Sequence, residues 1–263
     1  MSLLHRLRPD YEARVAEALA AHPPVALPVL GEADLAPLPP PVQRYLRRSG
    51  AVGKPRVDRV RVEWRAKMYR KPGEAPMDAP AVQVSFFAGP PVRLFFMTAT
   101  MKGLPVQVFH DYQGEAATMR VRAASLFDVV KLEGEALSRG ETVTVLNDMC
   151  FLAPGALVDP RLVWAPVDDR TARVTFTNGR HVVAATLLFD AEDQLVDFWS
   201  DDRPALVDGK LLPYRWNTPI SGYREVAGRW LPGRGSAVYA YPEGPFTYGE
   251  FEVRSVAYEV AGP

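Results

Sequence analysis

The chain has 263 residues, and its 31 Lys and Arg are balanced by 31 Asp and Glu, which gives a formal net charge of zero at pH 7. This balance argues against nucleic-acid binding. Hydrophobic residues make up 48% of the chain, enough for a substantial core, and the length fits one large β domain or two small ones. The single cysteine, Cys150, excludes an intrachain disulfide and a cysteine-cluster metal site.

Neither a membrane span nor a targeting segment is recognisable in the sequence. No apolar run approaches the roughly 20 residues needed to cross a bilayer. Residues 1–15 lack the apolar core of a secretory signal. We therefore expect no transmembrane segment and a cytoplasmic location by default. Association with the cell envelope stays open, because a targeting segment could precede this sequence.

The amino-terminal part alternates helical patterns with prolines. Apolar residues recur at helical spacing over 10–21, and a second helix is predicted over 42–49, after a Pro-rich connector that is too poor in N–H donors for regular structure. We assign residues 1–54 to this helical segment and connector, as part of the same fold. Residues 55–263 are assigned to an antiparallel β domain.

From residue 57 the apolar period changes to two, which predicts a half-buried strand over 57–68. Trp64 lies on its apolar side. The opposite side carries four cations, namely Arg59, Arg61, Arg65 and Lys67. We expect these cations to be exposed, because an unpaired buried charge is costly. The basic segment 44–71 is compatible with an acidic partner, but the pattern favours an ordinary solvated sheet face with acidic cross-strand neighbours.

Further strand patterns follow at hairpin spacing. They cover residues 81–88, 92–101, 105–112, 116–123, 126–133, 161–167, 213–226, 229–231, 235–241 and 246–259. Between two of these strands, residues 138–152 have apolar side chains at helical spacing, and Pro154-Gly155 would end a helix there. The Thr and Val content of this stretch also permits a strand.

Residues 171–203 have the pattern of a three-stranded meander, with Asn178-Gly179 as the clearest hairpin turn. Its second strand, 180–189, is apolar on both faces, as is 92–101, so both strands should be covered on both faces. The predicted fold is α+β and mostly β. We expect one large, curved, half-barrel-like antiparallel sheet of about ten strands, with the N-terminal helices and one mid-chain helix covering its concave face.

Three short helices cannot cover such a sheet, so part of the concave face should line an apolar pocket. We expect its ligand-binding residues to be Phe96, Phe109, His110, Asp111, Met149, Phe198, Trp199 and Arg203. Phe95 is the alternative to Phe96, because the two side chains point to opposite faces of one strand. His110 or Asp111 should lie at the rim of the pocket.

No conventional catalytic or phosphate-binding motif occurs, and no histidine has a second ligand at metal spacing, so we expect neither a metal site nor a cofactor. Two acidic clusters are compatible with acid–base chemistry. His110-Asp111 would need a bulge to bring both side chains to one face. Asp201-Asp202-Arg203 could act as paired carboxylates, or could close a turn as a simple ion pair.

Three functions are compatible with these patterns. The first is non-catalytic binding or carriage of an apolar or amphipathic small molecule, such as a lipid, in a cup between sheet and helices. The second is an enzyme that uses His110 and Asp111, or Asp201 and Arg203, in the same cup. The third is an interaction module that uses the basic 44–71 face. An empty apolar cup favours the first, and titratable groups that converge on a pocket favour the second.

Five segments carry a resemblance to a known family. They are LPPPVQRYLRRSG (38–50), HDYQG (110–114), residues 147–169 with their Pro-Gly-Ala-Leu, and the carboxyl-terminal GRWLP and FTYGEFEVRSVAYEV. With these motifs the chain resembles a family of uncharacterised bacterial proteins. The resemblance carries over no catalytic residue to this chain. The order of strands and helices is also similar to the half-barrel of lipoprotein localisation factors, in which a curved sheet cups helices and an apolar ligand. That second resemblance concerns the fold alone.

Overall fold

A single antiparallel sheet organises the computed structural model, which describes residues 7–123, 127–207, 209–260 and 262. Within this part of the chain the sheet has 15 strands, and it is open, with β7 at one edge and β8 at the other. The predicted fold class is confirmed, with more strands than expected. Residues 1–6 and residue 126 lie outside the described residues. Residues 1–6 belong to the amino-terminal stretch that lacks the apolar core of a secretory signal, and residue 126 is the expected first residue of a strand.

The first half of the sheet runs outward from its middle through consecutive hairpins. Its strands are β1 (Arg59–Met68), β3 (Ala81–Phe86), β4 (Val92–Met101), β5 (Leu104–Gln113), β6 (Ala116–Ala123) and β7 (Phe127–Glu133). Helix α3 (Glu135–Leu152) then carries the chain across the sheet to the opposite edge. The helix expected over 138–152 is therefore confirmed, and it begins three residues earlier.

The second half of the sheet returns from that edge to the middle. Its strands are β8 (Leu162–Asp168), β9 (Thr171–Asn178), β10 (His181–Phe189), β11 (Leu195–Ser200), β14 (Arg215–Asn217), β18 (Arg234–Tyr241) and β19 (Gly244–Ala257). The predicted meander is β9, β10 and β11. The last strand, β19, pairs with the first, β1, and so joins the two halves.

Several short elements extend this sheet or lie outside it. They are the 3-10 helices η1 (Glu32–Leu35) and η2 (Pro154–Ala156), the added strands β2 (Met77–Asp78) and β15 (Ile220–Ser221), and two separate hairpins, β12 (Ala205–Val207) with β13 (Lys210–Leu212) and β16 (Arg224–Val226) with β17 (Arg229–Leu231). The strand expected over 213–226 is thus broken into β14, β15 and β16.

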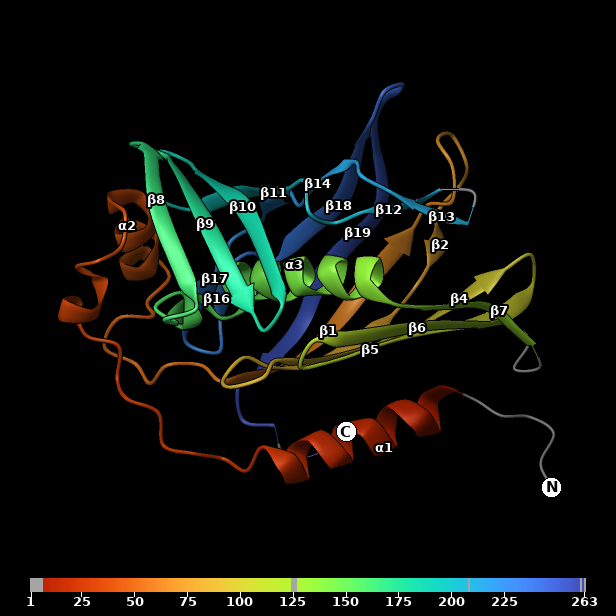
Figure 1. The fold of residues 1–263 in the computed structure, drawn as a ribbon, viewed down its shortest axis with the longest axis horizontal. Helices are drawn as coiled ribbons and strands as arrows, with labels where there is room; N and C mark the ends of the chain where they lie inside the picture. The colour runs from red at the N-terminus through yellow and green to blue at the C-terminus, as the bar shows by residue number, and fades with distance from the viewer. Residues whose placement is uncertain (1–6, 124–126, 208, 261, 263) are drawn as a thin grey trace.

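The three α-helices of the described chain lie on two different sides of the sheet (Figure 1). Helix α3 lies inside the curve, on the concave face, and α2 (Pro40–Arg48) contacts it there through a hydrogen bond of 2.7 Å from the Tyr45 hydroxyl to the carbonyl oxygen of Cys150. Helix α1 (Leu7–Ala21) lies on the convex face. The expectation that both N-terminal helices cover the concave face is therefore wrong for α1.

Helix α1 lies on the convex face because β4 is apolar on both faces, as predicted. Phe95 and Met97 belong to the main core on the concave side, whereas Phe96 belongs to a second core under α1. The Tyr11 ring of α1 stacks on Phe96 at 5.6 Å between ring centroids and meets Phe109 edge-on at 5.8 Å. Helix α1 covers apolar area that the concave helices cannot reach.

The basic face of β1 is only partly exposed. Trp64 is buried on the opposite side, and Arg65 and Lys67 are exposed, as expected. Arg59, however, is only 4% exposed. Its guanidinium forms an ion pair with Asp58 at 2.8 Å and donates to the carbonyl oxygens of His22 and Pro23 in the connector after α1. The connector covers this end of the strand, and these partners offset the cost of burying the charge.

Candidate functional site

Helix α3 carries a stripe of polar side chains into the middle of the molecule. Glu141, Thr144 and Asp148 follow one another at a spacing of three and four residues, which places them on one face of the helix. All three are buried, and Glu141 and Asp148 are only 2% and 3% exposed. Buried carboxylates require hydrogen-bonding or charged partners.

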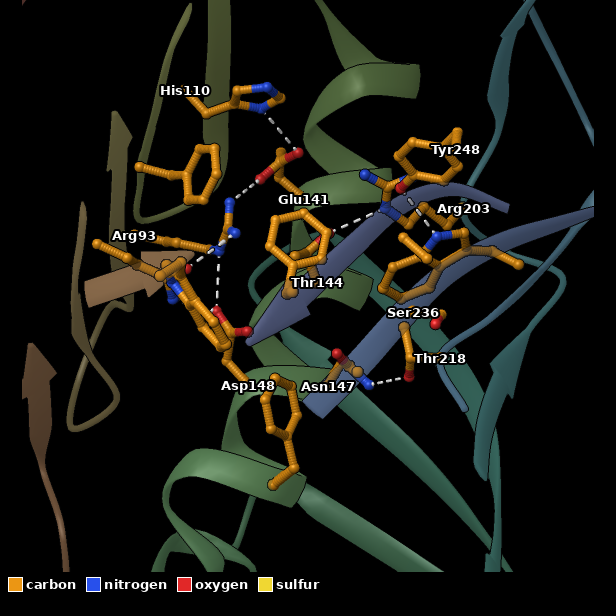
Figure 2. A pocket seen from close by; sticks show the side chains of 18 of the residues that line it. Arg93, His110, Glu141, Thr144, Asn147, Asp148, Arg203, Thr218, Ser236 and Tyr248 are labelled. Carbon is orange, nitrogen blue, oxygen red and sulfur yellow. Dashed lines mark hydrogen bonds and ion pairs between the residues drawn. The ribbon is translucent and has the colours of Figure 1, made fainter. Parts of the chain in front are cut away.

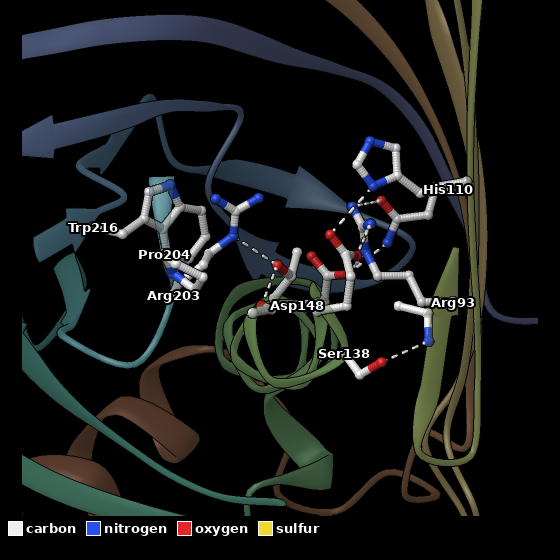
Figure 3. A network of polar contacts seen from close by, with 12 residues as sticks. Arg93, His110, Ser138, Asp148, Arg203, Pro204 and Trp216 are labelled. Atoms are coloured by element: carbon white, nitrogen blue, oxygen red, sulfur yellow. Dashed lines mark hydrogen bonds and ion pairs between the residues drawn. The ribbon is translucent and has the colours of Figure 1, made fainter. Parts of the chain in front are cut away.

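Arg93 on β4 supplies the main partner for both carboxylates (Figure 3). Its Nη1 donates to Glu141 Oε2 at 3.0 Å, and its Nε donates to Asp148 Oδ2 at 2.8 Å. Gln83 of β3 completes the group, because its Nε2 donates to Asp148 Oδ2 at 2.6 Å while its Oε1 accepts from Arg93 at 3.1 Å. One arginine thus joins two strands of the sheet to the helix.

His110 on β5 contacts the other oxygen of Glu141, with 3.2 Å between His110 Nδ1 and Glu141 Oε1. Burial alone would raise the pKa of Glu141, but His110, Arg93 and Arg203 outweigh it, and the pKa of this carboxyl lies well below its usual range. At Asp148 burial is the dominant influence, and it raises the pKa despite the opposing contacts with Arg93 and Gln83. The two carboxyl groups of α3 therefore differ in their readiness to take up a proton.

Arg203 lies on the other side of α3, directly before Pro204 (Figure 2). Its Nε donates to Thr144 Oγ1 at 3.0 Å, its Nη1 donates to the Tyr239 hydroxyl, and its guanidinium carbon lies 4.4 Å from the centroid of the Trp216 ring. The side chain is half-buried. Of the described carboxylates none forms an ion pair with Arg203, although Glu141 is near enough to interact with it electrostatically.

Gly140 explains how the chain at Arg203 comes so close to the helix. A Cβ atom at Gly140 would lie 3.3 Å from Pro204 Cδ and 3.5 Å from Arg203 Cγ. Glycine inside a helix costs roughly 0.5–1 kcal/mol relative to alanine. The close approach of the 203–204 segment gives a physical reason for that cost.

Two adjoining cavities surround this polar group. The first has a volume of about 150 Å³, and its wall includes the apolar side chains of Trp64, Phe95, Phe151, Trp216, Ile220 and Phe251. The second has a volume of about 400 Å³, and its wall includes those of Val108, Met119, Leu132, Leu206, Leu211 and Phe246. Six residues line both, namely Met68, Met97, His110, Glu141, Arg203 and Tyr248. Charged groups therefore lie at the junction, with apolar walls on either side.

A model of a protein family with the description "Family of unknown function (DUF6544)" matches residues 28–251, which is most of the chain. The chain belongs to this family. The resemblance to uncharacterised proteins seen in the sequence is thereby confirmed. No curated protein matches this DUF6544 chain.

Among solved structures, the chain is similar to a domain from Vibrio parahaemolyticus described as an outer membrane lipoprotein-sorting protein, with 8% identity, a TM-score of 0.42, and coverage of 76% of this chain and 84% of that one. It is similar to a DUF1329 family protein from Desulfovibrio piger, with 11% identity, a TM-score of 0.39, and coverage of 86% and 95%. A LolA superfamily protein from Nitrosomonas europaea shares 11% identity, with a TM-score of 0.38 and coverage of 84% and 94%. The expected resemblance to lipoprotein localisation factors is found, at the level of the fold alone.

Of the residues expected in the pocket of this DUF6544 protein, His110 and Arg203 line both cavities. Phe95 lines the first cavity, whereas Phe96 and Phe109 lie on the opposite face under α1. The placement of those two phenylalanines in the pocket is therefore wrong, because the alternation along β4 and β5 was assigned to the wrong face. Asp111 points to the α1 side, where it forms an ion pair with Arg14 at 3.1 Å.

The remaining expected residues do not line either cavity. Met149 and Phe198 are fully buried in the main core, where close packing uses their side chains. Trp199 is half-buried, with the guanidinium carbon of Arg215 at 5.7 Å from its ring centroid. The polar face of α3, rather than Met149, borders the open space.

The residues of the two acidic clusters, His110-Asp111 and Asp201-Asp202-Arg203, do not converge on one site in the structure. Alternation along β5 sends His110 and Asp111 to opposite faces, so they form no dyad. Asp201 pairs with Arg215 at 2.8 Å, and Asp202 accepts from Arg139 at 2.6 Å and from the backbone N–H of Ala184 at 2.7 Å. Only Arg203 of that cluster reaches the cavities. Within the described chain no group of three or more His, Cys, Asp or Glu side chains is placed to hold a metal ion.

The basic 44–71 segment is largely neutralised by ion pairs. Each of the following arginines has a carboxylate within 3.3 Å: Arg44, Arg47, Arg56, Arg59, Arg61, Arg65 and Arg70. A surface of unpaired cations would favour an interaction module, and these seven ion pairs argue against one over most of the segment. None of the helices in the described ranges is both long enough and apolar enough to cross a membrane.

Sequence reasoning missed Arg93, Glu141, Asp148 and Gln83. A signal for Arg93 existed, because it is the only charged residue in the strand VRLFFMTATM and lies on a strand that must be covered on both faces. Glu141 and Asp148 are seven residues apart in a helix that was recognised as apolar. Charges at such positions indicate an internal ion pair, since buried charges occur in pairs.

Proposed function

We propose that this protein binds an amphipathic small molecule in the two adjoining cavities between α3 and the sheet. The observation that carries the proposal is the combination of apolar walls with charged groups at the junction of the cavities. A purely structural core would be closed and apolar, whereas ligand sites are mostly apolar with a few polar groups that fix orientation. An apolar body would lie against Phe95, Phe151 and Phe251, and a polar group would lie near Arg203.

The polar face of α3 supports the same proposal. The ion pairs of Arg93 with Glu141 and Asp148, together with Gln83, hold the helix to β3 and β4. The helix is thereby fixed away from a full apolar contact with the sheet, and the space beside it remains open. A preformed cavity reduces the ordering cost of binding.

The experiment is a titration with the neutral environment-sensitive dye N-phenyl-1-naphthylamine. Ser236 lies on the wall of the first cavity, and Ser236→Phe would fill it. Ser255 on β19 is exposed, so Ser255→Phe serves as the matched control. We expect enhanced dye fluorescence with the wild type and the control, and a loss of at least tenfold in affinity for Ser236→Phe. Equal affinity in all three proteins, or no binding by any, would refute the proposal.

A second candidate function is acid–base catalysis by His110. The observation that favours it is the contact of Nδ1 with Glu141, because such a carboxylate orients an imidazole and stabilises its protonated form. His110 also lines both cavities, so a bound molecule would lie beside it. If His110 is catalytic, His110→Gln should leave dye affinity within about twofold of the wild type and abolish any turnover found by screening.

A further inference from the structure

Arg203 is the charged group at the cavity junction whose charge has no partner of opposite sign in direct contact. Two other arginines line the cavities, and both form ion pairs. Arg93 pairs with two carboxylates at 2.8 and 3.0 Å, and Arg70 pairs with Glu74 at 3.1 Å. Arg203 has only neutral groups as direct partners among the described residues, namely the hydroxyls of Thr144, Tyr239 and Tyr248 and the face of the Trp216 ring. A guanidinium has five N–H donors, so donors remain for a ligand.

Resting on the function proposed above, we propose that the ligand carries a carboxylate and that Arg203 binds it at the junction of the two cavities. The planar guanidinium matches a carboxylate with two parallel hydrogen bonds. Its half-buried position would strengthen such a pair relative to one in water. The apolar walls on either side then receive the rest of the molecule.

The surrounding charges select a carboxylate over a phosphate. Glu141 lies close enough to Arg203 to interact with it, and Asp148 follows on the same face of the helix. A phosphate monoester carries about −1.5 to −2 charges at neutral pH. A phosphate would therefore place more negative charge beside Glu141 than a carboxylate, which carries a single charge.

The Arg203 side chain is also held in place before any ligand arrives. Asp202, the preceding residue, is anchored by Arg139 and by the Ala184 N–H. Pro204, the following residue, accepts a hydrogen bond of 2.9 Å from the Tyr239 hydroxyl through its carbonyl oxygen. Gly140 allows this segment to lie against α3. A site that is arranged in advance loses less entropy when the anion binds.

The test compares three molecules with the same alkyl chain, dodecanoic acid, 1-dodecanol and dodecyl phosphate, by displacement of N-phenyl-1-naphthylamine at submicellar concentrations. We expect the wild type to bind the acid at least tenfold more tightly than the alcohol, and more tightly than the phosphate. Equal affinity for acid and alcohol would overturn the carboxylate site and leave the proposed function standing. Tighter binding of the phosphate would also overturn it. Failure of all three to bind, with no dye binding either, would refute the proposed function itself.

Variants test whether Arg203 is the residue that causes the preference for the acid. Arg203→Met should reduce the affinity for the acid at least tenfold and leave that for the alcohol within about threefold. Arg203→Lys keeps the charge and should retain part of the preference, which keeps the test informative if the methionine variant folds poorly. Arg215→Met is the matched control, because Arg215 pairs with Asp201 outside both cavities. An unchanged preference for the acid in folded Arg203→Met would overturn the assignment to Arg203.

Discussion

Arg93 provides the cation that the buried carboxylates of α3 require. It is buried and forms ion pairs with both Glu141 and Asp148, which are themselves buried. Replacing a buried ion pair by well-packed apolar groups is often neutral, but removing one partner leaves an uncompensated charge. The contribution of Arg93 is therefore best measured by removing it alone.

Arg93→Met should lower the free energy of unfolding by about 3–5 kcal/mol, because it leaves two carboxyl groups buried without their cation. Urea denaturation at neutral pH measures this change. Arg65→Met is the matched control, since Arg65 is exposed and pairs with Glu252 on the surface, and its loss should cost less than about 1 kcal/mol. Similar losses for the two variants would contradict the assigned role of Arg93.

The lowered pKa of Glu141 predicts a specific dependence of stability on pH. The folded state favours the ionised carboxylate, so its stabilisation is fully present above the ordinary pKa of 4.5 and is lost as the pH falls below that value. Asp148 acts in the opposite sense, because its pKa is raised from 3.8 and its contribution is lost as the pH rises through the raised pKa.

Glu141→Gln should therefore flatten the decline of unfolding free energy between about pH 4.5 and pH 3. Urea denaturation across this range compares the variant with Glu12→Gln, a substitution in an exposed pair of α1. A decline in Glu141→Gln as steep as in the control would show that Glu141 does not carry the effect.

Cys150 is fully buried in α3. Burial raises the pKa of the thiol well above its ordinary value. We expect no labelling by a polar thiol reagent in the native state and complete labelling in urea, and fast native labelling would contradict this.

At the scale of elements, β4 shows what a pattern predicts and where it stops. In β4, apolar residues on both faces indicated correctly that both faces are covered. The same inference is wrong for β10, where Val182 is 48% exposed and Ala184 and Leu188 are half-buried. The pattern has a period of two and treats the faces alike, so it could not indicate that Phe95 faces α3 and Phe96 faces α1. That choice depends on where helix α1 packs. Because α1 lies about 80 residues before β4 in the sequence, no local pattern contains this information.

The same strand supplies a matched pair of variants. Phe96→Ala should lower the unfolding free energy by about 3–5 kcal/mol, because it leaves a cavity beside Tyr11 in the core under α1, while dye affinity in the folded protein stays unchanged. Phe95→Ala should alter dye affinity, since it changes the wall of the first cavity. Thermal unfolding and dye titration of both proteins check this. A change of dye affinity in Phe96→Ala alone would contradict the assignment of the faces.

For the whole molecule, the open sheet and the helix that crosses it follow from the order of elements. Six hairpin-connected strands reach one edge, α3 crosses the concave face, and the remaining strands return until β19 pairs with β1. Local periodicity predicted most of these strands and the mid-chain helix. It did not predict the pairing of β19 with β1, because the two strands lie almost 200 residues apart, or the ion pairs inside the cup, which depend on that pairing.

The most direct test of ligand binding between α3 and the sheet is native mass spectrometry of the protein mixed with dodecanoic acid. The wild type and Ser255→Phe should each bind one molecule, and Ser236→Phe, with its cavity filled, should bind none. Each protein is compared at the same concentration, and circular dichroism establishes that it is folded. Equal binding by all three proteins, or no binding by the wild type, would contradict a ligand site in these cavities.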